Sequence, residues 1–161
     1  MVEWCAMQRK EYTKRIKPRD ASRLTVGIVV SRFNADITER MLKGALEVLH
    51  LSKVREDNIS IVQVPGSFEI PFGCLKLLKK KKPDAIVALG CIIRGETKHD
   101  EYLASAVSHG IIDLILHHRV PISFGVITTN NLAQAKVRSS GKTNKGGEAA
   151  RAALGMALLS V

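Results

Sequence analysis

Cysteine is scarce in this sequence, and its pattern excludes two classes of small protein. Cys5, Cys74 and Cys91 are an odd number at wide spacing, and none of them belongs to a C-x-x-C pair. A disulfide framework needs paired cysteines, and a zinc ribbon needs two closely spaced pairs. Both classes are therefore excluded, and we expect a reducing, cytoplasmic location.

Long apolar runs and aromatic residues are also rare. No run approaches the roughly 20 apolar residues that a membrane-spanning helix needs, and the first residues lack the apolar centre of a secretory signal. Aromatic residues make up 4% of the chain and hydrophobic residues 45%, so we expect a mostly aliphatic core and no membrane partner. A chain of 161 residues fits one domain, and its hydrophobic content excludes general disorder.

Acidic residues are outnumbered by basic ones. The chain has 15 Asp and Glu against 25 Lys and Arg, which gives a net charge of +10. Seven of the basic and three of the acidic residues fall in residues 1–23, which we interpret as a basic N-terminal arm, mobile or loosely docked, before a single domain over residues 24–161. A basic excess favours anionic partners such as phosphates. Nucleic acid is not expected, because the sequence has no groove-reading motif and no interleaving of aromatic and basic residues.

Short β-branched runs alternate with amphipathic segments along the domain. We expect strands at residues 24–30, 59–64, 85–89 and 122–127. We expect helices at residues 37–50 and 69–82, from residue 99 to an exit at Pro121, and at 131–138 and 146–159. This alternation predicts an α/β fold: a four-stranded, doubly wound parallel sheet with helices on both faces, in three layers. In such sheets ligands bind outside the carboxyl ends of the strands, so the loops there should hold the site.

The segment Arg94 to His99 leaves the third expected strand and opens the longest helix. Backbone N–H groups of Gly95, Glu96 and Thr97 would point outward at that helix start, where the helix dipole favours an anion such as phosphate. Taken alone, these residues are better explained by an ordinary helix start capped by Thr97.

His99 is the strongest candidate for proton transfer, because imidazole titrates near neutral pH. The other four histidines fall near helix ends or in the middle of the long helix, whereas His99 follows a loop at the carboxyl end of a strand. A metal site is not expected here, since Asp100 and Glu101 are adjacent to His99 on a helix and adjacent helical side chains do not converge.

Two nucleotide-binding motifs are absent. Gly141-Lys142-Thr143 lacks both the upstream glycine and the preceding strand of a phosphate-binding loop, and no G-x-G-x-x-G follows a strand. Arg138 begins a cationic segment that suits a phosphate, although a solvated basic loop is an equal alternative.

Three of the four phenylalanines suggest a flat ligand. Phe33 and Phe68 lie in loops expected at the carboxyl edge of the sheet, and Phe124 lies on the fourth strand. A heteroaromatic ring would use such side chains for stacking or edge contacts. Core packing is the alternative, particularly for Phe124.

Taken together, five segments resemble the lumazine synthase family. They are GIVVSRFN (27–34), VPGSFEIPF (64–72), DAIVALGCIIRGETKH (84–99), FGVITTNN (124–131) and NKGGEAA (144–150). They occur in the family's order and spacing, across residues 24–159. The resemblance implies a flavodoxin-like fold, with the basic arm outside the family core.

The resemblance also implies a reaction, without cofactor or metal. A transferase of this family condenses 5-amino-6-(D-ribitylamino)uracil with 3,4-dihydroxy-2-butanone 4-phosphate and releases phosphate and water, in the penultimate step of riboflavin biosynthesis. The alternative is a non-catalytic homologue that carries flavin or lumazine, against which the presence of His99 and Arg138 argues. Family members form pentamers with sites at subunit interfaces. The loop KTNKG, from Lys142, is one residue shorter than the family's KAGNKG, which bears on assembly into larger shells.

The resemblance assigns a role to each candidate residue. Contacts with the pyrimidine and ribityl groups fall on Phe33, Ser67, Phe68, Glu69, Cys91, Ile92, Ile93 and Phe124. Phosphate contacts fall on the amides of Glu96 and Thr97 and on Arg138 from a neighbouring subunit. His99 is the implied acid and base.

Overall fold

The computed structural model describes residues 19–159, so most of the arm expected at residues 1–23 lies outside the described residues. Its strands are β1 (Val26–Ser31), β2 (Ile59–Val64), β3 (Ala85–Ile93) and β4 (Ile122–Thr129). Its α-helices are α2 (Ala35–Leu51), α3 (Ile70–Lys80), α4 (His99–His118), α5 (Leu132–Arg138) and α6 (Lys145–Ala157). Short 3-10 turns occur at Glu56–Asn58, Ser67–Glu69 and Gly141–Thr143.

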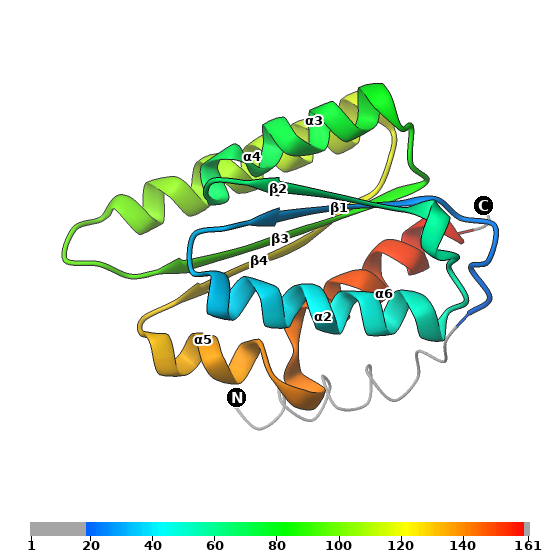
Figure 1. The fold of residues 1–161 in the computed structure, drawn as a ribbon. Coiled ribbons are helices and arrows are strands. Elements are labelled where there is room, and N and C mark those ends of the chain that lie inside the picture. The colour runs from blue at the N-terminus through cyan, green and yellow to red at the C-terminus, as the bar shows by residue number, and fades with distance from the viewer. Residues whose placement is uncertain (1–18, 160–161) are drawn as a thin grey trace.

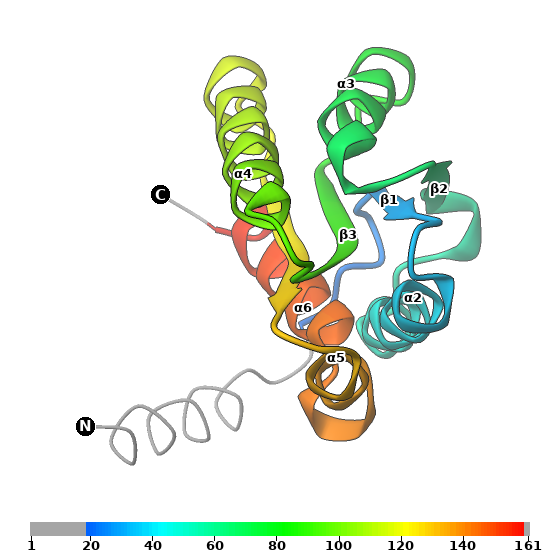
Figure 2. The same ribbon diagram turned by 90° about the vertical axis from the view of Figure 1, so that its left-hand side faces the viewer.

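The described strands form one parallel sheet in the order β2-β1-β3-β4, which lies between two layers of helices. Helices α3 and α4 cover one face, and α2, α5 and α6 cover the other (Figures 1 and 2). Each layer has its own apolar cluster, because β1 and β3 are buried on both faces. The predicted three-layer, doubly wound α/β fold is confirmed.

Strand β3 is longer than the sequence suggested. We expected a loop from Gly90, but the strand continues to Ile93 and pairs with β4 as far as Thr129. Gly90 lies inside this strand with close neighbours: a Cβ there would lie 2.7 Å from Ser67 Oγ and 2.8 Å from Ile70 Cδ1. A glycine that suggested a loop therefore suits close packing within a strand.

The body of the fold includes residues ahead of the boundary expected at Leu24. Ala21 is buried, and its N–H donates to the carbonyl of Ser52 at the end of α2. Asp20 pairs with Lys53 Nζ at 3.0 Å beside it.

No helix among the described residues is long and apolar enough to cross a membrane.

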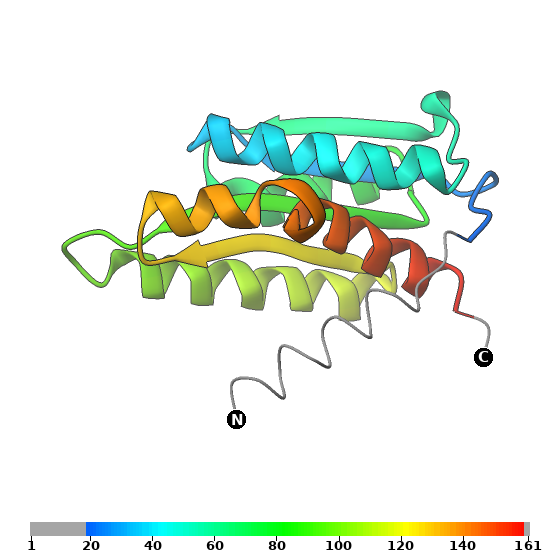
Figure 3. The ribbon, with the colours of Figure 1, turned by 90° about the horizontal axis from the view of Figure 1, so that it is seen from below.

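Helices α2 and α6 pack unusually close together, side by side on one face of the sheet (Figure 3). A Cβ on Gly146 would lie 1.9 Å from the carbonyl oxygen of Met41 in α2. Because the obstacle is backbone, a side chain cannot be accommodated by rotating a neighbour. Position 146 therefore sets the distance between the two helices.

Replacing Gly146 with alanine should destabilise the fold by about 3 kcal/mol, because the new methyl group forces α6 away from α2. Gly155→Ala is the matched control on the same helix, since a Cβ there meets nothing within 4 Å. We expect the control to stabilise the protein by about 0.5–1 kcal/mol through helix propensity. Thermal unfolding of both variants tests the pair, and equal unfolding midpoints would contradict the close contact.

Candidate active site

A pocket opens at the carboxyl edge of the sheet, the edge that Figure 2 faces, as expected for a doubly wound fold. Its volume is about 640 Å³, which suits a small-molecule ligand. The loops after β1, β2 and β3 and the start of α4 form its walls. The lining residues are Phe33, Gly66, Ser67, Phe68, Glu69, Cys91, Ile92, Ile93, Gly95, Thr97, His99, Asp100 and Leu103.

The loop after β1 is fastened to both neighbouring strands. The N–H of Phe33 donates to the carbonyl of Pro65, 3.0 Å away, beyond the end of β2. Asn34 donates from Nδ2 to the carbonyl of Cys91 in β3, also at 3.0 Å. Asn34 has a left-handed backbone conformation, with φ 59°, which asparagine tolerates better than most residues. These bonds place the Phe33 side chain at the mouth of the pocket.

Two exposed aromatic side chains flank the pocket. Phe33 is 69% exposed and Phe68 is 63% exposed, although phenylalanine is usually buried in a protein of this size. Both line the pocket, so their free faces are available to a ligand. This arrangement suits stacking or edge contacts with a flat ring.

The end of β3 supplies an apolar wall made of Cys91, Ile92 and Ile93. Cys91 and Ile92 are buried, and Ile93 is half-buried. Burial raises the pKa of the Cys91 thiol to about 11. The thiol therefore stays neutral at physiological pH and contributes shape rather than a thiolate nucleophile.

The turn after β2 contributes polar groups. Ser67 is buried and packs near Gly90 of β3, and the Glu69 carboxylate accepts the N–H of Gly66 at 2.9 Å. This bond closes the turn immediately before α3 begins. Ser67 and Glu69 both line the pocket, and their contact with a polar substituent of the ligand stays a prediction.

His99 is the first residue of α4 and lines the pocket with an exposed side chain. Its N–H donates to Thr97 Oγ1 at 3.4 Å. An exposed imidazole at the mouth of the pocket is accessible to both ligand and solvent. The geometry thus allows the acid and base role predicted for His99.

The start of α4 differs from the expected phosphate cradle. The helix begins at His99, so the amides of Gly95, Glu96 and Thr97 lie in the loop ahead of it and not in its first turn. Lys98 occupies the N-cap position, and the Thr97 hydroxyl accepts the N–H of His99 from one residue further out. Gly95 and Thr97 line the pocket, whereas Glu96 is exposed outside its lining.

Phe124 and Arg138 lie outside the pocket of their own chain. Phe124 is 46% exposed on the edge strand β4. It pairs in register with Ala88 of β3, which precedes the pocket residue Cys91 by three residues. Arg138 ends α5 on the opposite face of the sheet from α3 and α4, and its Nη1 donates to the carbonyl of Gln134. The role expected for Arg138 in a neighbouring subunit stays a prediction.

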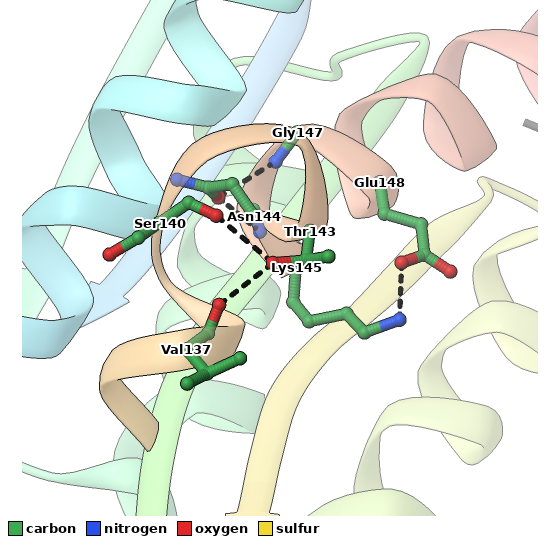
Figure 4. Close-up of polar contacts among 8 residues, drawn as sticks. Val137, Ser140, Thr143, Asn144, Lys145, Gly147 and Glu148 are labelled. Atoms are coloured by element: carbon green, nitrogen blue, oxygen red, sulfur yellow. Dashed lines mark hydrogen bonds and ion pairs between the residues drawn. The ribbon is translucent and has the colours of Figure 1, made fainter. Parts of the chain in front are cut away.

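The loop that follows Arg138 is held by a dense set of polar contacts (Figure 4). Asn144 accepts the N–H groups of Gly146 and Gly147 at the start of α6 and donates to the carbonyls of Arg40 and Ser139. Thr143 Oγ1 donates to the carbonyls of Val137 and Ser140, and Lys145 pairs with Glu148. The shortened loop is therefore a fixed connection between α5 and α6.

Sequence analysis missed several residues of the pocket lining. Gly66, Asp100 and Leu103 were not assigned to the site. Leu103 could have been found, because it lies one helical turn after His99 and therefore on the same face of α4. No three His, Cys, Asp or Glu side chains within residues 19–159 are grouped as metal ligands would be.

Known proteins resemble this chain over most of its length. Residues 23–160 match the family described as 6,7-dimethyl-8-ribityllumazine synthase. A relative of that name from Parabacteroides distasonis is 44% identical over 138 residues, which are 85% of this chain and 86% of the relative. The chain belongs to the 6,7-dimethyl-8-ribityllumazine synthase family.

Proposed function

We propose that this protein condenses 5-amino-6-(D-ribitylamino)uracil with 3,4-dihydroxy-2-butanone 4-phosphate to form 6,7-dimethyl-8-ribityllumazine. The observation that carries the proposal is one pocket with exposed aromatic faces and an exposed histidine, in a member of this family. Phe33 and Phe68 suit the pyrimidine ring, and His99 supplies a proton donor and acceptor. As a transferase of riboflavin biosynthesis, the protein would act in the cytoplasm.

The chemistry needs repeated proton transfer and little else from the protein. The ring amine forms a bond to the ketone carbon of the second substrate, and loss of water gives an imine. Removal of a proton from carbon then lets phosphate leave with the electrons of its C–O bond, and the second nitrogen closes the ring with loss of water. His99 can take and return these protons. Holding both substrates together supplies several kcal/mol more through effective concentration.

The two substrates would contact different parts of the pocket wall. The pyrimidine ring would lie against Phe33 and the apolar end of β3, with its ribityl chain near Ser67 and Glu69. The phosphate would lie towards the loop of Gly95 to Thr97, where backbone amides are available. In this arrangement the amine of one substrate faces the carbonyl of the other beside His99.

A homopentamer would complete each site with residues of a neighbouring subunit. Helix α4 supports such an assembly, because only Val107 and Ile111 of its residues are buried within the chain. Tyr102 and Leu116 of the same helix are 72% and 71% exposed. Exposed large apolar side chains along one helix favour burial against a second copy. The neighbouring Arg138 would then bind the phosphate.

The test is an absorbance assay with both substrates, purified protein and no added metal. We expect lumazine to form faster than the spontaneous background. Arg138→Ala should raise the KM of the phosphate substrate by about 10- to 100-fold, because a charged hydrogen bond is lost. Lys142→Ala removes an exposed cation from the same segment and should leave this KM unchanged.

A background rate from folded, assembled protein would contradict the proposed reaction. If that protein still bound the aminopyrimidine, a carrier of lumazine or flavin would replace the enzyme as the favoured function. An unchanged KM in Arg138→Ala, beside a clear rate, would leave the reaction intact and remove Arg138 from the phosphate site.

A further inference from the structure

Asn34 lies at the N-cap position of α2, but its side chain does not cap the helix. Asparagine at an N-cap usually accepts an N–H of the first helical turn through its side-chain oxygen. Asn34 makes no such bond within the described residues. Its Nδ2 atom instead donates to the backbone carbonyl of Cys91 in β3, at 3.0 Å. The side chain therefore connects the start of α2 to a strand that is distant in the sequence.

The start of α2 is stabilised by other groups. The backbone carbonyl of Asn34 accepts the N–H groups of Ile37 and Thr38, at 2.9 and 3.1 Å. Thr38 is buried, and its Oγ1 donates to the carbonyl of Ser31 at the end of β1, at 2.8 Å. These bonds do not use the Asn34 side chain. Replacing that side chain should therefore cost α2 none of them.

The backbone of Asn34 restricts which residues can take its place. Its φ and ψ angles are 59° and 46°, in the left-handed region that glycine and asparagine adopt more readily than other residues. Glycine would keep the turn from β1 into α2 but lose the amide. Alanine would lose the amide and also strain the turn. The hydrogen bond of Asn34 can thus be separated from its backbone conformation by experiment.

The bond to Cys91 joins the two sides of the proposed ring site. One side is Phe33, the residue before Asn34, and the other is the apolar wall at the end of β3. The pairing of β1 with β3 ends at Val30 and Leu89, so the Asn34 amide reaches two residues further along β3 than this pairing does. Asn34 is not itself among the residues that line the pocket. Its amide is therefore placed to hold two walls together rather than to contact a ligand.

We propose that Asn34 is a positioning residue, which holds Phe33 at the distance from β3 that a flat ring needs before the aminopyrimidine binds. This inference rests on the proposed function. The N–H of Phe33 fixes the same loop to the carbonyl of Pro65 beyond β2, so the loop is held on both sides while the Asn34 amide is present. Without the amide the loop loses its bond to β3, and the ordering of Phe33 then opposes binding.

The test compares Asn34→Gly and Asn34→Asp with Asn58→Gly. Asn34→Gly keeps the left-handed turn and removes the amide, whereas Asn34→Asp keeps the size of the side chain and replaces the donor by an acceptor. Asn58 lies immediately before β2, at the opposite edge of the sheet from the pocket, and its replacement controls for added backbone freedom. Equilibrium binding of 5-amino-6-(D-ribitylamino)uracil alone is measured for each variant.

We expect Asn34→Gly to weaken this binding by about 3- to 10-fold, the usual effect of one hydrogen bond between uncharged groups. Asn34→Asp should bind no more tightly than Asn34→Gly, because an ionised carboxylate cannot donate to the carbonyl of Cys91. Asn58→Gly should bind as the unmodified protein does. In the reaction, the KM of the aminopyrimidine should rise in both Asn34 variants, while kcat and the KM of the phosphate substrate stay unchanged.

A double-mutant cycle shows whether Asn34 acts through Phe33. Phe33→Ala removes the aromatic face, so adding Asn34→Gly to it should change the affinity by less than about 2-fold. Effects that multiply independently would show that Asn34 does not act through Phe33 and would overturn the inference. A lower thermal unfolding midpoint in Asn34→Gly, with unchanged binding of the aminopyrimidine, would show a purely structural role and overturn it as well.

The binding experiment also distinguishes this inference from the proposed function. Unmodified protein that binds the aminopyrimidine, beside Asn34→Gly with equal affinity, would overturn the role of Asn34 alone. A loss confined to kcat would place the effect in the chemical step and would also overturn it. Unmodified protein that fails to bind the aminopyrimidine would overturn the proposed function and this inference together.

Discussion

Replacing His99 with alanine should slow lumazine formation by about 10²- to 10⁴-fold, the usual contribution of a general acid or base. The loss should appear in kcat at saturating concentrations of both substrates, because the imidazole moves protons and is not needed to bind either substrate. The exposed position of His99 at the start of α4 makes a folding defect unexpected. Steady-state kinetics, with size measurement of the assembly, checks the prediction.

His50→Ala is the matched control for a lost imidazole. His50 lies in the last turn of α2, is exposed, and pairs with Glu56 at 2.8 Å; it does not line the pocket. Its replacement should leave kcat unchanged. An unaltered kcat in His99→Ala would remove His99 from proton transfer and leave the substrates' own groups, or solvent, to move the protons.

Asn144→Ala should destabilise the protein by about 2–4 kcal/mol, since one side chain makes an N-cap and two further hydrogen bonds. Its Oδ1 caps α6, and its Nδ2 bonds the carbonyls of Arg40 and Ser139 at 2.8 and 2.9 Å. Losing it frees the loop that follows Arg138. We therefore expect a lower thermal midpoint and a higher KM for the phosphate substrate.

Asn131→Ala is the control that removes a helix cap alone, without the two further hydrogen bonds that Asn144 makes to Arg40 and Ser139. Asn131 caps α5 through a single bond, from the N–H of Gln134 at 3.0 Å, so its loss should cost about 1 kcal/mol. A comparable loss of stability in both variants would show that the bonds to Arg40 and Ser139 contribute nothing. An unchanged KM in Asn144→Ala would show that Arg138 is positioned by α5 alone.

Most of the fold could be predicted from local patterns. The β-branched run that became β1 and the alternation with helices are properties of neighbouring residues, so strands and layers were found. The missed boundary at Gly90 depends on Ser67 and Ile70, which lie more than 15 residues away and press against β3. No local pattern contains that contact.

The candidate site could be predicted only in part, for similar reasons. Residues on the loops at the carboxyl edge, such as Phe33 and His99, follow from the topology of a doubly wound sheet. Arg138 lies outside the pocket of its own chain, and its expected role in a neighbouring subunit stays a prediction. Asp100 was also missed, since a pocket lining depends on which distant segments come together around it.

The hydrogen bonds that hold the loop after β1 bear on how the ligand preference of the pocket could be changed. The bonds that hold this loop end on backbone carbonyls, those of Pro65 and Cys91. Side chains at Phe33 and Cys91 can therefore change while the same bonds are kept. The backbone of this loop is held independently of the side chains at positions 33 and 91, so a redesign of ligand preference can exchange those side chains one at a time on an unchanged backbone.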